Sequence, residues 1–418
     1  MMHLTRIQLP SRKVVYPFTL VASLFFLWGF AYGLLDVSRK HFQDILGLTK
    51  LESTLLQVAY FGLGYLCFSP VAGEVLKRKG YKVTILMGLA IFSVGTILFW
   101  PCAKFASQDN KKAVFAGFVI CTGIFASGIA SLEMAASSYV TCLPGANPSG
   151  AAFRLQLGQA VCGTAVLIGP FIASKWFFTG GHADNLSSVQ WLYLSMSLLG
   201  VAAAIVFAIS NLPETPESEL EAAVQAAAQL AGITSKTNDS FFKQHRLLFG
   251  WLCQFLYVGS QVNAYSFFIN YGVEVVGWSN AKSSTFFSYS LIVFLFGRFV
   301  ALVFLVFFPV ELMVGLCGAC CTVLVCCVIS LRGMPGFICL MLLFFFMGPL
   351  IPGNFATATK DLGRHSRRGA SLMISAVAGG AIFPPIQGAI ADIYGTRISY
   401  AICIPSFVYT ATQAGSCV

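Results

Sequence analysis

Two carboxylates interrupt the apolar runs of this 418-residue chain and are its first candidates for chemistry. Glu133 lies within "GFVICTGIFASGIASLEMAASSYV", far from either end of that run. A charged residue at the centre of a membrane helix costs about 2.5–3.5 kcal/mol on insertion scales. We therefore expect Glu133 to face a protein cavity, where it can bind and release a proton. The alternative is a structural acid that pairs with a neighbouring helix.

Asp36 and Arg298 are the other charges within apolar runs. Asp36 ends the stretch "FFLWGFAYGLLD" and lies about 20 residues into the first run, close to its far end. By position alone, Asp36 can be a boundary residue or a site residue. Arg298, in "LIVFLFGRFVALVFL", can be the counter-ion of a carboxylate or line a pathway.

Amide and phenol groups recur at helical spacing in two of the runs. Gln156 and Gln159 are three residues apart, and Gln261 and Tyr265 are four apart, so each pair shares a helix face. Asn263 stands between the second pair. Such groups suit a neutral polyhydroxylated ligand, which needs many donors and acceptors but no counter-charge. We predict that these five residues line a central polar cavity; hydrogen bonding between helices is the alternative for each.

The composition indicates that a lipid bilayer surrounds these residues. Of the chain, 57% is hydrophobic and 10% is charged, whereas a soluble domain carries about 25% charge. The net charge of +10 forms no basic stripe with interleaved aromatics, so we expect no nucleic-acid partner. No H-E-x-x-H or G-x-S-x-G motif occurs, and we expect no enzyme. Cys317 and Cys320 form a C-x-x-C but lack the further ligands of a zinc site.

Twelve runs of about 20 apolar residues are each long enough to cross ~30 Å of hydrocarbon. They lie at 17–37, 53–75, 82–102, 113–137, 152–174, 190–210, 247–271, 283–307, 310–331, 335–357, 369–391 and 397–414. We predict an all-α polytopic membrane protein with two six-helix halves. The first half covers 1–210 and the second covers 247–418, and a polar linker at 211–246 joins them.

Orientation follows from the lysines and arginines of the short loops. The basic N-terminus, "KRKGYK" and "KDLGRHSRRGA" fall on one side when the number of spans is even. We predict that both termini and the linker are cytoplasmic. Asn185, in "NLS", then faces outside, where it is a candidate for glycosylation.

Two further features are typical of a carrier with moving halves. The pattern A-V-x-G occurs at 160–163 and at 376–379, which are 216 positions or one six-helix repeat apart. Helix-breaking residues interrupt two spans. We predict breaks at Pro349, Pro352 and Gly353 in the tenth span and at Pro384 with Pro385 in the eleventh.

At these residues a family resemblance is visible. The chain resembles the fucose–proton symporter family of the major facilitator superfamily, in the form found in many fungal sequences. The matching stretches are "FFLWGFAYGLLDV", "LLQVAYFGLGYL", "AGEVLKRKGYK", "SLEMAASSYV", "FLYVGSQVNAYSFFINY", "FGRF", "RHSRRGAS" and "AVAGGAIFPP". The resemblance implies that Asp36 and Glu133 handle the proton and the sugar. The chain departs from the family at Tyr32 and Gly33, where sugar-carrying bacterial members have two asparagines.

Together, the residues and the resemblance predict a proton-coupled secondary transporter with the fold of that superfamily. The expected solute is small and polar, most simply a sugar of the fucose or hexose type. The alternative is a proton-antiport exporter of a metabolite or drug on the same fold, since a fold does not fix the substrate. We expect no cofactor beyond the proton gradient, and the solute, protons and the lipid bilayer as partners. The expected form is a monomer in the plasma membrane.

Overall fold

The computed structural model describes residues 12–46, 55–105, 110–143, 148–176, 187–214, 222 and 240–416. All regular secondary structure within these residues is helical. Each of the twelve predicted spans coincides with helical structure in this part of the chain, which confirms the predicted all-α class.

The first half of the chain contains five long helices and one π-helix. They are α1 (Arg12–Leu46), the π-helix η1 (Ala59–Phe68), α3 (Ser69–Lys104), α4 (Lys111–Cys142), α5 (Pro148–Trp176) and α6 (Ser187–Ile209). The helix α3 contains the end of the second predicted span and all of the third, because the chain is helical on both sides of a sharp turn at Gly80. Gly80 has φ 81° and ψ −178°, a conformation that only glycine adopts readily.

The second half of the chain is more interrupted. Its long helices are α8 (His245–Ser266), α10 (Asn280–Phe307), α11 (Val310–Ser330), α12 (Met334–Met347) and α15 (Gly379–Tyr394). Its shorter elements are η4 (Phe241–Lys243), α9 (Phe268–Val276), α13 (Leu350–Thr359), η5 (Gly363–His365), α14 (Ser366–Ser375), η6 (Ala376–Ala378), α16 (Thr396–Ser399), η7 (Tyr400–Cys403) and α17 (Ile404–Ser416).

The predicted helix breaks are partly right. The tenth span is divided between α12 and α13 at Gly348 and Pro349, as predicted, whereas Pro352 and Gly353 lie inside α13. The prediction of a break at Pro384 and Pro385 is wrong, because both lie inside α15. The eleventh span is irregular earlier, at η6, where the small residues Ala376–Ala378 form a 3-10 turn.

Nine helices of the described residues are long and apolar enough to cross a membrane. The difference from twelve has a simple origin. Leu55–Lys104 counts once although two spans meet in it at Gly80. The spans formed by α8 with α9 and by α16 with α17 are not among the nine, although α8 alone has 22 residues, because polar side chains lower their mean hydropathy.

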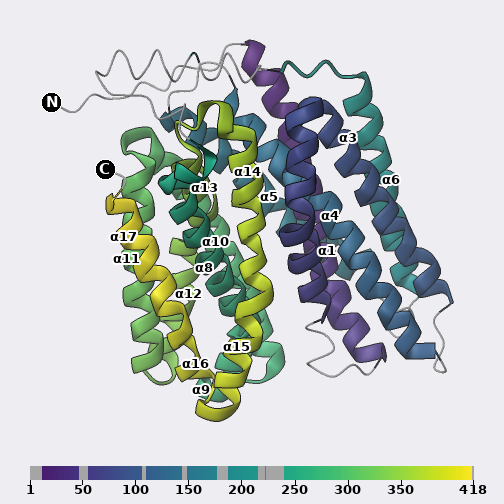
Figure 1. Cartoon of the computed structure of the whole chain (residues 1–418). Helices are drawn as coiled ribbons and strands as arrows, with labels where there is room; N and C mark the ends of the chain where they lie inside the picture. Colours follow the sequence, from purple (N-terminus) through teal and green to yellow (C-terminus); the bar gives the residue numbers. More distant parts are fainter. Residues whose placement is uncertain are drawn as a thin grey trace.

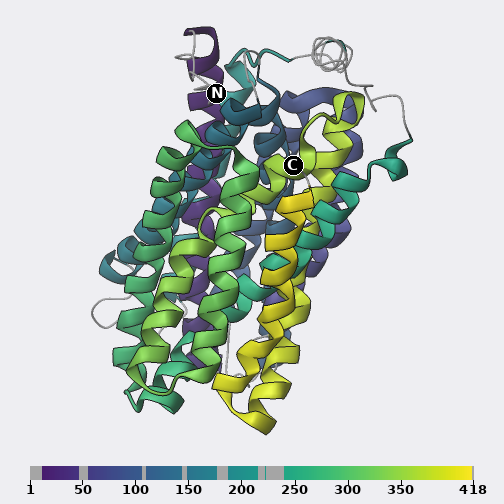
Figure 2. The same cartoon turned by 90° about the vertical axis from the view of Figure 1, so that its left-hand side faces the viewer.

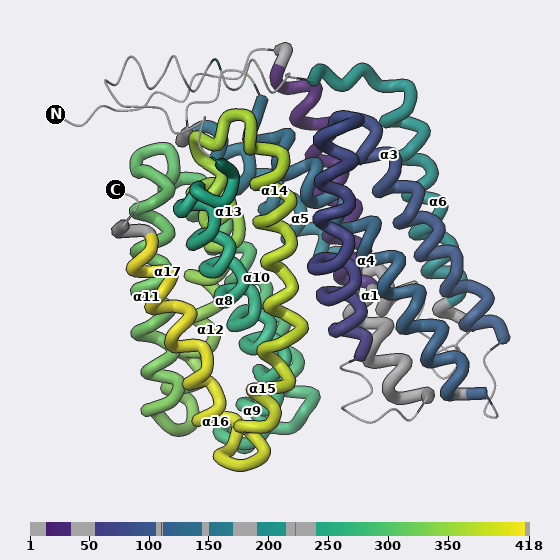
Figure 3. The backbone as a smooth tube through the Cα atoms, viewed as in Figure 1, coloured from purple at the N-terminus to yellow at the C-terminus, as the bar shows by residue number. Residues whose placement is uncertain are grey.

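The helices form two bundles that lie side by side, one from each half of the chain (Figures 1 and 2). In the first bundle α3 packs on α4 and α6, and α1 packs on α5. In the second bundle α11 packs on α12 and α17, and α8 packs on α15. Between the bundles, α5 contacts α10 and α13, and α3 contacts α14 (Figure 3).

Helix α1 begins and helix α17 ends at the same end of the molecule. We call it the basal end, and it is drawn at the top of Figure 1. The turn at Gly80 and the start of α14 also lie there, since α3 and α14 are in contact around Leu76 and Arg367. Of the predicted linker, residues 215–221 and 223–239 lie outside the described part of the chain. Its boundaries therefore stay a prediction.

Candidate functional site

Glu133 lies on α4 in the interior of the molecule, with 8% of its surface exposed. The hydroxyl of Tyr65 donates a hydrogen bond of 2.9 Å to Oε2 of Glu133. The hydroxyl of Tyr60 is 3.4 Å from that of Tyr65. A chain of two phenols therefore leads to the buried carboxyl group.

The π-helix η1 is the reason that these two phenols meet. A π-helix places residues i and i+5 next to each other, whereas an α-helix places i and i+4 together. Tyr60 and Tyr65 are five residues apart and both lie in Ala59–Phe68. Our sequence reasoning missed them. The signal was the five-residue spacing of two tyrosines around Gly62 and Gly64 in a membrane span, and π-helical turns are frequent at functional sites.

Arg298 approaches this carboxyl group from the other half of the chain. It lies on α10 and is 5% exposed. Its Nη1 donates to the backbone carbonyl of Gln159 on α5, and the side chain of Gln159 lies within hydrogen-bonding reach of Glu133. Its guanidinium carbon is 4.7 Å from the ring centre of Phe294. Glu133, Gln159 and Arg298 thus form one buried group across the two halves.

The break between α12 and α13 supplies the second acceptor for Arg298. The Nε atom of Arg298 donates to the carbonyl of Gly348 over 3.2 Å. In a continuous helix that carbonyl would accept from residue 352, but Pro352 has no N–H. The proline therefore leaves one backbone acceptor free at the depth of Arg298.

The five predicted ligand residues take different positions. Gln156 donates from its side chain to the backbone carbonyl of Arg298 over 3.2 Å, so it joins α5 to α10. Gln261 donates to the Tyr265 hydroxyl over 2.9 Å. Asn263 is fully buried and donates to Sγ of Cys403, 4.0 Å away in the same half. Gln159 therefore belongs to the group around Glu133, whereas Asn263 packs inside the second bundle.

Aromatic rings surround the polar groups of this region. Tyr265 stacks on Phe344 with ring centres 5.1 Å apart and meets Phe294 edge-on at 5.9 Å. Tyr32 on α1 lies 5.6 Å from Tyr60 between ring centres. Tyr32 comes from the first half and Tyr265 from the second half. The region thus offers flat apolar surfaces beside a few amide and hydroxyl groups.

Two predicted site residues cannot be placed in this group. Asp36 lies within α1, but its side chain falls outside the described residues. Asn185 also lies outside the described part of the chain. Their predicted roles stay predictions.

The basal end is closed by contacts between the halves that we call the basal latch. Nη1 of Arg367 on α14 donates to the Leu76 carbonyl over 3.3 Å, and its Nη2 is 4.0 Å from Oε2 of Glu214. Its guanidinium lies over the Tyr81 ring at 5.1 Å. Ser371 donates to the Ser69 carbonyl over 2.8 Å. The basal latch is made by Ser69, Leu76 and Tyr81 from the first half, by Glu214 from the linker, and by Arg367 and Ser371 from the second half.

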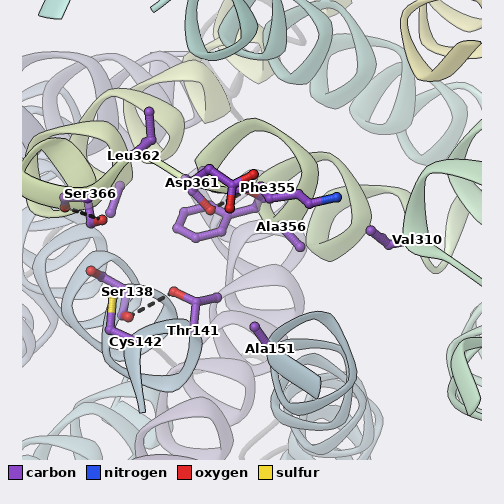
Figure 4. A pocket seen from close by; sticks show the side chains of 14 residues that line it. Ser138, Thr141, Cys142, Ala151, Val310, Phe355, Ala356, Asp361, Leu362 and Ser366 are labelled. Carbon is purple, nitrogen blue, oxygen red and sulfur yellow. Dashed lines mark hydrogen bonds between the residues drawn. The ribbon is translucent and has the colours of Figure 1, made fainter. Parts of the chain in front are cut away.

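A cavity of about 160 Å³ lies between the halves near the basal latch (Figure 4). Ser138, Thr141 and Cys142 of α4 face Phe355 and Asp361 of the second half across it. None of the five predicted ligand residues lines this cavity. Among the residues that the structure describes, no cluster of three or more His, Cys, Asp or Glu side chains could hold a metal ion.

The fold and the sequence match one family. A family model of the Major Facilitator Superfamily matches residues 19–376, which is most of the chain. The chain belongs to this superfamily. The predicted superfamily fold, with twelve membrane-spanning segments, is confirmed.

Members of the superfamily with known names resemble the chain over nearly its full length. The L-fucose-proton symporter of Haemophilus influenzae is 28% identical over 406 residues, which cover 91% of this chain and 90% of that protein. The glucose/galactose transporter of Brucella abortus is 28% identical over 402 residues, with 95% and 92% covered. Both are transporters, in agreement with the predicted class of protein and against an enzyme.

A solved structure agrees with the same assignment. The superfamily transporter FucP, crystallised in the outward conformation, matches with a TM-score of 0.82 and 25% identity, over 97% of this chain and all of that one. A proton:xylose symporter, XylE, matches with a TM-score of 0.70 and 15% identity. The second match supports the fold alone.

Proposed function

We propose that this protein is a secondary transporter that moves a sugar together with protons by alternating access. The observation that carries the proposal is the buried carboxyl of Glu133, hydrogen bonded to Tyr65 and facing Arg298 of the other half. An ionisable residue inside a membrane bundle is expensive and usually serves transport. The names of the relatives support the solute, since one is a fucose–proton symporter and another a glucose/galactose transporter.

The solute site that we propose lies between the halves, next to Glu133. Tyr32 and Tyr265, which lie among other aromatic rings, supply flat surfaces for the apolar face of a ring. Gln159 and Gln261 supply donors and acceptors for hydroxyl groups. Mostly apolar walls with a few convergent polar groups are the usual composition of a small-molecule site.

The proton gradient is the energy source in this proposal, and no cofactor is needed. Glu133 takes up a proton on one side and releases it on the other as the halves rock about the site. Asp36, close to the end of α1 that lies away from the basal end, is proposed as a second proton-handling residue.

The orientation that we propose places the basal end in the cytoplasm. The bases Lys77, Arg78, Lys79 and Lys82 lie at the turn that contains Gly80, and Arg367 lies opposite them in the basal latch. With the basal end closed, the conformation corresponds to an outward-facing state, as the likeness to FucP in its outward conformation supports. Both termini are then cytoplasmic, Asn185 faces outside, and the carrier works as a monomer in the plasma membrane.

A proton-antiport exporter is the second candidate. Tyr32 and Gly33 stand where bacterial sugar carriers have two asparagines, which favours a less hydroxylated solute. An exporter would keep Glu133 and the basal latch and would reverse only the direction of solute movement relative to the proton.

Purified protein in proteoliposomes tests both candidates. Labelled L-fucose, D-galactose and D-glucose are offered outside, with the lumen alkaline, acidic or at equal pH. Symport predicts that at least one sugar accumulates above its equilibrium level only when the lumen is alkaline. Accumulation only with an acidic lumen indicates antiport, and no dependence on pH contradicts proton coupling.

A further inference from the structure

Two cysteines of the first half face each other at the end of the molecule opposite the basal end. We call it the distal end, and it is drawn at the bottom of Figure 1. The Sγ atoms of Cys102 on α3 and Cys121 on α4 are 4.0 Å apart. Gly117 lets the two helices approach here, because a Cβ atom at that position would lie 2.9 Å from Sγ of Cys102. A disulfide has an S–S distance of about 2.05 Å, so the sulfur atoms need to approach by roughly 2 Å, which rotation about the Cα–Cβ bonds allows.

The second half contains a similar pair. Cys327 on α11 lies within hydrogen-bonding reach of Cys339 on α12. Cys102 and Cys121 belong to the third and fourth predicted spans, and Cys327 and Cys339 belong to the ninth and tenth. These are equivalent spans of the two six-helix halves. We call the four residues the distal cysteine pairs.

Both pairs lie near the depth at which the helices reach the bilayer surface. Trp100 and Lys104 stand on either side of the first pair in α3, and Nζ of Lys104 lies 4.5 Å from the Trp100 ring centre. Close to the second pair, Arg397 donates to the carbonyl of Ile329. Tryptophan, lysine and arginine are typical of the membrane–water interface. Soluble oxidants can therefore approach these pairs, whereas the centre of a bilayer excludes them.

We propose that each half carries one disulfide bond at its distal end, between Cys102 and Cys121 and between Cys327 and Cys339. This inference goes beyond the proposed function. It uses the proposed orientation, which places the distal end outside the cell, where disulfides form and persist. All four residues are free thiols in the structure, which is therefore the reduced form of the protein.

The chemistry of each bond is an exchange with a small disulfide such as oxidised glutathione. One protein thiolate attacks the small disulfide and expels one glutathione thiolate, and the neighbouring protein thiolate then attacks the mixed disulfide and expels the second. Each protein disulfide gives up two electrons and two protons, which leave on two glutathione thiols. Cys102, Cys327 and Cys339 are partly exposed, so each pair has a thiol for the first step.

The two bonds stabilise the halves without locking them together. Each joins helices that already pack on each other within one half, α3 with α4 and α11 with α12. Alternating access moves one half against the other as a largely rigid body, so the oxidised carrier remains able to transport. A closed loop removes freedom from the unfolded chain and so favours the folded protein.

Peptide mass spectrometry of protein from intact cells tests the proposal. Free thiols are blocked with N-ethylmaleimide at lysis, and the protein is digested without reductant. The linked peptides should account for more than half of each distal cysteine pair, and reduction before blocking should convert them to blocked thiols. A pair that is blocked without reduction overturns the proposal for that half.

Lys112 reports on the orientation independently of the thiols. It is exposed on α4 at the distal end, so a membrane-impermeant amine reagent should label it on intact cells. Labelled Lys112 together with free cysteines overturns the disulfides and leaves the orientation and the proposed transport standing. Lys112 that is labelled only after lysis overturns the orientation, and with it the oxidising surroundings on which the disulfides depend.

Serine variants test what the bonds do. Dithiothreitol should lower the thermal unfolding temperature of the oxidised, unaltered protein in detergent by several degrees. It should have no effect on the double variant Cys102→Ser with Cys327→Ser, which has neither bond. Cys142→Ser is the matched control, because Cys142 lies on α4 beside the basal cavity, and it should respond to dithiothreitol as the unaltered protein does. An equal response of the double variant and the unaltered protein would overturn the stabilising role.

Discussion

At the scale of residues, the important contact is the hydrogen bond from Tyr65 to Glu133. It places a single O–H donor 2.9 Å from a buried carboxyl oxygen. A hydrogen bond to a charged group contributes about 1.5–3 kcal/mol. In the proton-free carrier the Tyr65 hydroxyl donates to a charged carboxylate, and in the proton-loaded carrier it faces a neutral carboxyl group. Tyr65 therefore stabilises the proton-free carrier more than the proton-loaded one.

Tyr65→Phe is therefore expected to slow proton-driven uptake about tenfold or more, while the ring and its packing remain. Exchange of labelled for unlabelled solute at equal pH should fall much less, because it does not require Glu133 to release its proton. The matched control is Tyr60→Phe. The hydroxyl that this change removes lies 3.4 Å from that of Tyr65 and does not contact Glu133 directly. Equal effects of both variants on uptake and exchange would contradict this assignment.

At the scale of elements, the contact of α3 with α14 holds the basal end closed. Alternating access requires this contact to open, so the basal latch should set the balance between the two states. Cys142 is half-buried and lines the basal cavity, so it reports on opening with a thiol already present in the chain.

Arg367→Gln should increase the rate at which a soluble maleimide labels Cys142 by about tenfold, because it removes a charged donor from the Leu76 carbonyl. Labelling is measured by mass spectrometry of the peptide that contains Cys142. Arg397→Gln, at the other end of the molecule, should leave the rate unchanged. An unchanged rate in Arg367→Gln would show that the basal latch does not hold the closed state.

The turn at Gly80 gives a second prediction at this scale. Gly80→Ala should destabilise the fold by more than the about 1–2 kcal/mol that a left-handed conformation costs an L-residue, because a side chain there also meets the Glu214 carboxylate. Gly277→Ala is the control, with φ 79° and no atom within 4 Å of the added carbon. Thermal unfolding in detergent should rank unaltered protein, Gly277→Ala and Gly80→Ala from most to least stable. A Gly80→Ala variant as stable as Gly277→Ala would contradict the close packing of Glu214.

At the scale of the whole molecule, hydropathy was sufficient to predict the twelve spans, because the cost of exposed backbone in lipid leaves helices as the only solution for such runs. Glu133 and Arg298 were visible for the same reason, since a charge in an apolar run stands out. Their approach across α4, α5 and α10 was not visible, because it depends on how the bundles pack.

Local geometry was harder to predict than the spans. The π-helix that joins Tyr60 to Tyr65 follows from packing and not from periodicity. Asn263 lies on the same helix as Gln261 but on another face, where it donates to Cys403. The polarity of a side chain does not tell which face of the helix it occupies. The sequence shows that Pro352 leaves the Gly348 carbonyl without its helical donor. It does not show that Arg298 is the neighbour that donates to this carbonyl.

The central claim is that Glu133 carries the coupling proton, and one measurement tests it most directly. Proteoliposomes with unaltered protein or with Glu133→Gln are loaded under an imposed pH gradient and at equal pH. Glutamine keeps the size and hydrogen bonding of the side chain but cannot lose a proton. Accumulation driven by the gradient should disappear in Glu133→Gln, while solute exchange at equal pH persists in part. Gradient-driven accumulation at the unaltered level in Glu133→Gln would contradict the claim.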